Sequence, residues 1–219
     1  MTLPAAERKS ALRRQIRAAR AALTAQDRAR ASEGLAASVR RARALAGAGD
    51  TTLAFLPHAS EPPVMAALEE LHATGSRVLV PRVLPERRLE WVLWQPGEPL
   101  VRSPHVPLDE PSGPAASDLR PSLVLVPALG IGENGVRLGQ GGGFYDTFLA
   151  SLPASDSVLV AAVVYDDELA LPDAPAEPWD AVLEWAVTPG GLWRRRPPQA
   201  AETRVAPGRC PRSTRWRLA

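Results

Sequence analysis

The spacing of apolar residues changes several times along the chain, and each change predicts the boundary of a secondary-structure element. Residues 123–126 form a continuous apolar run, Leu-Val-Leu-Val, which is typical of a strand buried on both faces of a parallel sheet. From Phe144 to Leu152 the apolar residues recur at helical spacing. Many glycines lie between these two patterns, so we predict a strand, a glycine-rich loop and a helix within residues 122–152.

The N-terminal segment has the pattern of two amphipathic helices. Within residues 11–23 the apolar residues form one stripe that is surrounded by arginines. Thr24, with Asp27 three residues later, resembles a capping box, so we expect a second helix to begin there and to run through Leu45.

The next segment reads as a strand, a helix and a strand, over residues 51–56, 62–72 and 77–80. This order implies a parallel sheet that binds ligands beyond the carboxyl ends of its strands. Further elements are expected downstream: an antiparallel or edge strand over 89–94, a long surface loop over 95–121 and a buried strand over 157–164. We therefore predict an α/β fold, a three-layer Rossmann-like sandwich with a mostly parallel central sheet and an N-terminal helical pair.

The length of 219 residues suits one sizeable domain, which we place at residues 1–190. The remaining segment, 191–219, is rich in Arg and Pro and is expected to be a disordered or loosely attached tail. Cys210 is the only cysteine, so no intramolecular disulfide can form, and a reducing cytoplasm fits. No apolar stretch has the length of a membrane span, and the N-terminus lacks a signal-peptide core.

The formal net charge of +2 conceals a strong asymmetry. Residues 7–43 carry a net charge of +8, residues 44–191 one of −13, and residues 192–219 one of +7. A basic segment can bind nucleic acid, but basic ends that flank an acidic body are equally explained by contacts within the chain or by solubility. We expect small-molecule ligands rather than nucleic acid or a membrane, and a monomer.

The glycine-rich loop is the most informative stretch of the chain. Its glycines allow positive φ and a close approach of the backbone to a ligand, and it leads into a helix N-terminus, where free N–H groups favour phosphate. The loop matches neither the Walker A motif nor the GxGxxG motif, and reads R-L-G-x-G-x-G-[FY]-Y-D. Arg137 offers a planar fork to phosphate oxygens, and Asp146 beside a polyphosphate would require a cation such as Mg²⁺. The alternative is a flexible turn before a helix with an ordinary acidic first turn.

Residues 127–146, PALGIGENGVRLGQGGGFYD, resemble the signature of the 5-formyltetrahydrofolate cyclo-ligases, also called 5,10-methenyltetrahydrofolate synthetases. That signature is approximately P-G-L-[AG]-F-D-x-x-G-x-R-L-G-x-G-x-G-[YF]-Y-D, and the resemblance extends over about residues 9–188. The chain departs from it at Ala128, Ile131 and Gly132, in the approach to the loop. These departures concern local packing more than phosphate binding.

The resemblance implies ATP as co-substrate and Mg²⁺ as cofactor. It assigns phosphate contacts to Lys9 and Arg13, which share one face of a helix as i and i+4. Arg137 and Tyr145 are the implied catalytic residues. The implied nucleotide-binding residues are Lys9, Arg13, Arg137, Leu138, Gly139, Gln140, Gly141, Gly142, Gly143, Phe144 and Tyr145.

The resemblance also implies a folate site and a metal site. The implied folate-binding residues are His58, Glu61, Gln140, Gly141, Gly142, Gly143 and Phe144. Asp146 and, in the segment EPWDAVLEWAVTP, Asp180 are the implied Mg²⁺ ligands, although Trp179 replaces the usual His. Glu61 could equally be a helix-start acid, His58 an unspecific histidine and Asp180 a residue that precedes a strand.

The expected activity is the MgATP-dependent conversion of 5-formyltetrahydrofolate to 5,10-methenyltetrahydrofolate, with release of ADP and phosphate. The formyl oxygen would be phosphorylated and N10 would then close the ring, so the site must supply positioning and charge neutralisation. The alternative is an inactive relative that binds folate, nucleotide or RNA, and the departures from the signature and the basic tail motivate it.

Overall fold

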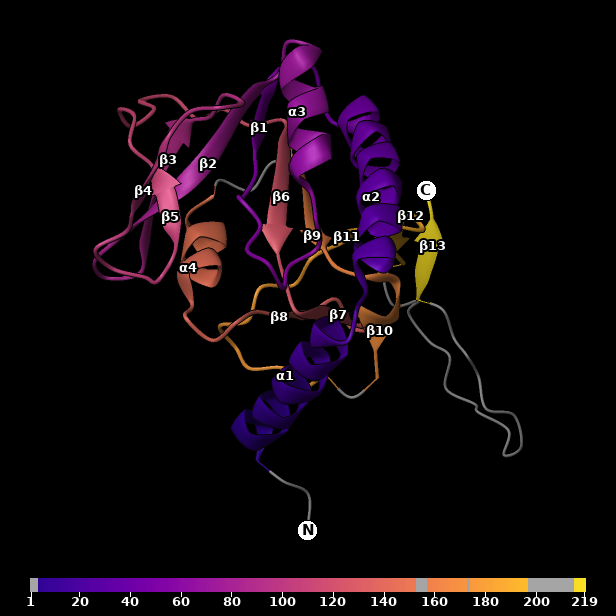
Figure 1. Cartoon of the computed structure of the whole chain (residues 1–219). Coiled ribbons are helices and arrows are strands. Elements are labelled where there is room, and N and C mark those ends of the chain that lie inside the picture. The colour runs from indigo at the N-terminus through magenta and orange to yellow at the C-terminus, as the bar shows by residue number, and fades with distance from the viewer. Residues whose placement is uncertain (1–3, 153–156, 173, 197–214) are drawn as a thin grey trace, which may run out of the picture.

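The structure, a computed structural model, describes residues 4–152, 157–172, 174–196 and 215–219. The expected α/β class is confirmed, because a large and mostly parallel sheet carries helices on both faces (Figure 1). The helices are α1 Ala5–Ala21, α2 Ala25–Leu45, α3 Met65–Ala73, α4 Phe144–Ser151 and the 3₁₀ helix η1 Asp166–Glu168. The strands are β1 Thr51–Leu53, β2 Arg77–Leu84, β3 Arg88–Leu93, β4 Leu100–Arg102, β5 Asp109–Pro111, β6 Leu123–Pro127, β7 Gly130–Gly132, β8 Arg137–Leu138, β9 Leu159–Val163, β10 Leu169–Leu171, β11 Trp185–Thr188, β12 Gly191–Arg195 and β13 Trp216–Leu218.

The main sheet has the strand order β13-β12-β11-β9-β6-β1-β2-β3. The neighbours from β11 to β2 are parallel, and β3, β12 and β13 are antiparallel. The continuous apolar run forms β6 at the centre, where Leu123 and Leu125 face α2 and α3 and Val124 and Val126 face the side of α4. Burial on both faces is what the unbroken apolar pattern predicts.

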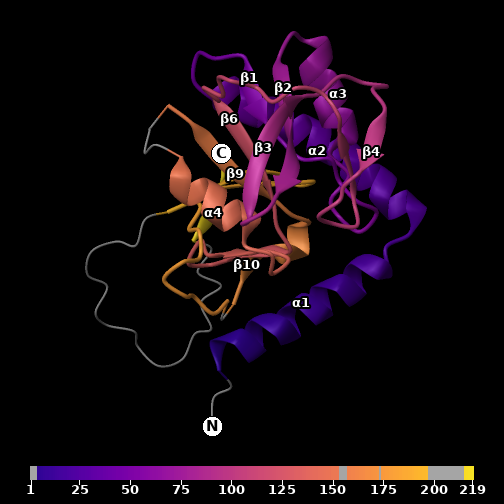
Figure 2. The same ribbon diagram turned by 90° about the vertical axis from the view of Figure 1, so that its left-hand side faces the viewer.

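The N-terminal helical pair is confirmed, with changed bounds. The capping box at Thr24 forms as expected, since its hydroxyl accepts the Asp27 N–H and the Asp27 carboxylate accepts the Thr24 N–H. Helix α1 begins earlier than predicted, at Ala5, and projects beyond the carboxyl end of β6 beside the small sheet of β10, β7 and β8 (Figures 1 and 2). No helix in the described part of the chain is long and apolar enough to cross a membrane.

Several local predictions are corrected by the structure. Helix α3 begins at Met65, so Glu61 precedes the helix and does not lie in its first turn. The two prolines that follow Glu61 disfavour helical backbone there. Residues 95–121 include the paired strands β4 and β5, and part of the glycine-rich loop forms the β7–β8 pair.

The predicted tail is also corrected in part. Gly191–Arg195 and Trp216–Leu218 are strands of the main sheet, so the expectation of disorder is wrong for them. Trp216 is fully buried, and its indole N–H donates to Gly132 O at 3.2 Å. A buried aromatic ring offers enough apolar surface to fix so short a strand. Residues 197–214 lie outside the described residues, and the division at residue 190 stays a prediction.

Candidate active site

A basic pocket of about 580 Å³ lies where α1, the β2–β3 hairpin, β8 and the start of α4 meet, at the carboxyl end of β6. Its lining includes most of the residues that sequence reasoning linked to phosphate or metal. The pocket residues are Lys9, Arg13, Arg87, Arg137, Gly139, Gly141, Gly143, Asp146, Thr147, Ala150, Glu177, Trp179 and Asp180. Residues separated by more than 170 positions in the chain therefore share one hollow.

The last glycine of the loop is the N-cap of α4. Gly143 has φ of 74°, and Gly141 has φ of 109°, values that glycine adopts without strain. The Gly143 carbonyl accepts the Thr147 N–H at 3.0 Å, which begins the helical hydrogen bonding. The N–H groups of the first turn have no partner within the helix and carry the positive end of its dipole. The loop is thus shaped to receive an anion.

The buried Arg137 forms an ion pair with the half-buried Asp146 on the wall of the pocket. The guanidinium donates to both oxygens of Asp146, at 2.7 and 3.3 Å, and to Pro127 O at 2.9 Å. A methyl group built on Gly139 would lie 2.7 Å from two nitrogens of Arg137, so only glycine leaves room for this guanidinium. The order of Arg, Leu and Gly in the motif therefore has a packing reason in this chain.

Lys9 also lines the pocket and is also paired. Its ammonium contacts Glu177 at 2.5 Å and both oxygens of Asp180 at 2.6 and 2.7 Å, and the side chain is almost fully buried. Arg13 lies one turn further along α1, where its Nε donates to Gly139 O at 2.8 Å. Of the predicted pair of cations, Arg13 thus contacts the glycine loop, and Lys9 contacts the carboxylates of the 177–180 segment.

The remaining loop residues have separate environments. Gln140 accepts hydrogen bonds from Arg17 through its carbonyl and its side chain, at 3.2 and 2.9 Å. Leu138 is buried against Ile16, and a methyl group on Gly142 would lie 2.9 Å from the Phe144 ring. None of Leu138, Gln140, Gly142 and Phe144 lines the basic pocket.

His58 and Glu61 follow β1 and lie outside this pocket. The buried Glu61 carboxylate accepts the His58 backbone N–H at 3.2 Å and lies 3.3 Å from its ring Nε2. Tyr145 lies in the first turn of α4, directly after the glycine loop, and its hydroxyl is near the Glu61 charge. Burial raises the pKa of the Tyr145 hydroxyl well above its usual range, and the nearby Glu61 charge raises it further. The hydroxyl has no hydrogen-bond partner among the described residues.

The donor set for a cation consists of carboxylates alone. Asp146 and Asp180 both line the pocket, and the Ala181 N–H, next to Asp180, donates to Asp146 at 3.4 Å. No cluster of three or more metal-ligating side chains occurs within residues 4–152, 157–172, 174–196 and 215–219. Two carboxylates fit Mg²⁺ when phosphate oxygens complete its shell, because this ion is usually held by few protein ligands.

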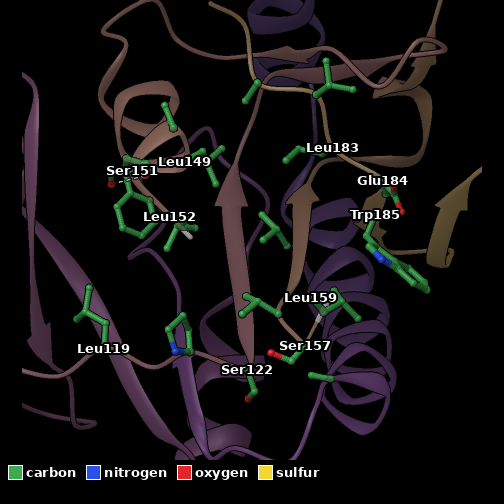
Figure 3. Close-up of a pocket in the computed structure, with 18 of the residues that line it drawn as sticks. Leu119, Ser122, Leu149, Ser151, Leu152, Ser157, Leu159, Leu183, Glu184 and Trp185 are labelled. Carbon is green, nitrogen blue, oxygen red and sulfur yellow. Dashed lines mark hydrogen bonds between the residues drawn. The ribbon is translucent and has the colours of Figure 1, made fainter. Parts of the chain in front are cut away.

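A larger hollow of about 1460 Å³ adjoins the pocket along the face of the sheet (Figure 3). Leu149 of α4 and Leu152, which directly follows that helix, border it on one side, and Leu183 and Trp185 border it on the other. It shares Asp146 and Asp180 with the basic pocket but includes none of the loop glycines or the arginines that face them. The glycine loop and the arginines that face it therefore belong to the smaller pocket.

Sequence reasoning missed two charged residues of the pocket, Glu177 and Arg87. Glu177 could have been predicted, because it lies three positions before Asp180 in the segment that resembles the family. Arg87 had no signal, because it lies in a turn 50 residues before Arg137 and belongs to no motif.

The departures from the signature do not open or block the pocket. Ile131 is fully buried, and a side chain on Gly132 would lie 2.4 Å from Asn134 and 2.8 Å from Ala174. Both positions are thus fixed by packing, as expected. Trp179 lines the pocket but is 70% exposed, so it crowds no other residue there.

An α/β protein with a basic, glycine-lined pocket at the carboxyl end of a parallel sheet is the class that these observations define. The model of the 5-formyltetrahydrofolate cyclo-ligase family matches residues 5–189. The chain belongs to this family, and the expected enzyme class, a cyclo-ligase, is confirmed.

Similar proteins agree with this family. The 5-formyltetrahydrofolate cyclo-ligase of Mycolicibacterium smegmatis is 39% identical over 149 residues, which are 64% of this chain and 74% of that protein. The protein of the same name from Escherichia coli K12 is 30% identical over 148 residues, which are 65% of this chain and 80% of its own.

Two solved structures show the same fold. The 5,10-methenyltetrahydrofolate synthetase of Mycoplasma pneumoniae has a TM-score of 0.64 at 21% identity, over 83% of this chain and 98% of that one. The synthetase of Aquifex aeolicus has a TM-score of 0.66 at 20% identity, over 89% and 96%.

Proposed function

We propose that the protein converts 5-formyltetrahydrofolate and ATP to 5,10-methenyltetrahydrofolate, ADP and phosphate, in a reaction that requires Mg²⁺. The observation that carries this proposal is the pocket in which arginines from separate elements face a glycine loop at the start of α4, with two carboxylates beside them. Family membership supplies the folate substrate. The geometry supports the phosphate half of the reaction.

The formyl oxygen is the nucleophile of the first step. It attacks the γ-phosphorus of ATP, a bond forms between them, and the bond to ADP breaks. N10 then attacks the activated formyl carbon with its lone pair and loses its proton to water or phosphate. The carbon–oxygen bond breaks, phosphate leaves, and the methenyl bridge remains between N5 and N10.

The protein contributes positioning and charge to these steps. Arg13 and Arg137 hold phosphate oxygens as planar forks, and Lys9 acts as a point charge in the same pocket. Asp146 and Asp180 would hold Mg²⁺, which neutralises phosphate charge when it is bound. Charge stabilisation of this kind accounts for most of the catalysis of phosphoryl transfer.

Tyr145 acts on the folate side of the loop. Because burial raises its pKa, its hydroxyl stays protonated at physiological pH and offers an unused donor. We assign this donor to the formyl oxygen or its phosphate. Glu61 and His58 hold the pterin, and the Gln140–Phe144 backbone lies between the two substrates. The other expectations stay proposals: a cytoplasmic location, which rests on the single Cys210, and a monomer.

The test is absorbance on mixing the protein with 5-formyltetrahydrofolate and MgATP, because the methenyl product has a conjugated bridge that the substrate lacks. Arg13→Ala should raise the KM for ATP by about tenfold, since a charge-assisted contact is worth about 1.5–3 kcal/mol. Arg14→Ala is the matched control, because Arg14 is the next residue of α1 and bonds only to Ser10. A protein that binds folate or ATP yet forms no absorption band would overturn the proposal in favour of the inactive relative.

A further inference from the structure

We propose that Arg87, at the tip of the β2–β3 hairpin, is a further arginine of the phosphate site and contacts the phosphate groups of the nucleotide. The inference rests on the proposed function and adds a residue that lies outside both the glycine loop and the N-terminal helix. It also identifies the hairpin as part of the active site.

The alternate glycines of the loop each face a different arginine. A methyl group built on Gly139 would lie 2.7 Å from the guanidinium of Arg137, and one on Gly141 would lie 3.9 Å from that of Arg13. A methyl group on Gly143 would lie 3.4 Å from Nη1 of Arg87 and 3.5 Å from its Cδ. Three guanidinium groups from β8, α1 and the hairpin therefore follow the loop in order, and Arg87 stands beside the N-cap of α4.

Arg87 differs from the other cations of the pocket in having no partner. Lys9 is paired with Glu177 and Asp180, and Arg137 with Asp146. Arg87 makes no hydrogen bond or ion pair with any residue in the ranges that the structure describes. Lys9 and Arg137 thus offset two of the three acids of the pocket, and the unpaired Arg87 charge adds to that of the helix N-terminus as attraction for an anion.

The backbone of the hairpin holds Arg87 in place at a cost. Glu86 and Arg87 have φ of 60° and 59°, and the Arg88 N–H donates to Pro85 O at 3.3 Å, which closes the turn. A turn with two positive φ values normally carries Asn and Gly. A non-glycine residue in this conformation is strained, and strain of this kind is concentrated at functional sites. An arginine at such a position fits a role in binding rather than in folding.

The position of Arg87 favours nucleotide phosphate over the carboxylates of folate. It lines the same hollow as Lys9 and Arg13, whereas His58 and Glu61, the expected folate contacts, lie outside it. A planar guanidinium beside free backbone N–H groups matches the oxygens of a phosphate group.

The experiment compares two glycine variants of the turn in the full chain. Arg87→Gly and Glu86→Gly place glycine at equivalent positive φ values, so both relieve backbone strain, but only the first removes the guanidinium. Isothermal titration measures the affinity for ATP and, separately, for 5-formyltetrahydrofolate. We expect Arg87→Gly to weaken ATP binding by about tenfold, which corresponds to about 1.4 kcal/mol. Folate affinity, and the ATP affinity of Glu86→Gly, should stay within about twofold of wild type.

Arg87→Lys adds a second readout. It keeps the charge and loses the planar fork, so it should recover only part of the ATP affinity. Equal ATP affinity in Arg87→Gly and wild type would overturn the inference and leave the proposed function intact, and so would a loss of folate affinity alone. A wild-type protein that binds no ATP would overturn the proposed function itself, together with this inference.

Discussion

At the scale of single residues, Gly139 and Arg137 show how the motif works in this chain. The guanidinium occupies the space where a side chain on residue 139 would lie, and it reaches Asp146 and Pro127 O from there. The glycine is therefore required by a neighbouring side chain and not by its own φ. The motif is a packing unit as well as a flexible loop.

Gly139→Ala should displace Arg137 from its partners Asp146 and Pro127 O. We expect kcat/KM for ATP to fall by at least about tenfold and the free energy of unfolding to fall by about 1–3 kcal/mol, because partly buried hydrogen bonds to a charged group are lost. Steady-state kinetics and urea unfolding measure the two effects. Gly113→Ala is the control, since among the described residues the added methyl group would meet only Cγ1 of Val92, at 3.1 Å, and it should retain wild-type kinetics. Unchanged kinetics in Gly139→Ala would contradict the assigned role of Arg137.

These loop residues could be predicted from the sequence because they are contiguous and form one recognisable motif. Arg87 and Glu177 could not be found in that way. Arg87 reaches the pocket only because the β2–β3 pairing places its turn beside α4, and neither its neighbours in sequence nor its charge indicate this. Only the tertiary structure therefore brings all the charged residues of the pocket together.

At the scale of elements, α1 is held in place by a buried ion pair near its C-terminal end. Arg20 donates to both oxygens of Glu168 at 2.6 and 2.8 Å and to Ala128 O at 2.7 Å, and both side chains are almost fully buried. Ala128 lies in the approach to the glycine loop. The pair therefore fixes the helix that carries Lys9 and Arg13 relative to the loop that they face.

Arg20→Ala should reduce the free energy of unfolding by about 3–5 kcal/mol, because it leaves the Glu168 carboxylate buried without its charged partner, although the Tyr165 N–H still donates to it at 2.8 Å. The double variant Arg20→Met with Glu168→Leu should cost less, since apolar residues of similar size can replace a buried pair. Urea unfolding of the single and double variants gives this comparison. Arg40→Ala is the surface control and should cost less than about 1 kcal/mol, because its pairing with Glu70 is largely exposed. A double variant less stable than Arg20→Ala would contradict this account.

At the scale of the whole molecule, contacts within the chain explain part of the charge asymmetry of the sequence. The basic N-terminal segment pairs with the acidic body through Lys9 with Glu177 and Asp180, and through Arg20 with Glu168. Self-complementarity, one of the two explanations open from the sequence, therefore accounts for part of the asymmetry. A nucleic-acid partner is not needed to explain these cations.

The overall fold was predictable because β6, β9 and the helices carry strong periodic patterns. The C-terminal strands were not, because β13 has only three residues and depends on the burial of Trp216 against segments distant in the sequence. The composition indicated a disordered polar tail, but the burial of Trp216 stabilises a strand there. Short edge strands of this kind are determined by tertiary packing and not by local propensity.

The central claim is that the basic pocket couples ATP cleavage to closure of the folate ring. The most direct measurement follows phosphate release and the methenyl absorption band in the same reaction. The account predicts one phosphate for each methenyl group formed, with neither product in the absence of ATP, Mg²⁺ or 5-formyltetrahydrofolate. Phosphate release that proceeds without folate, or without the absorption band, would contradict it.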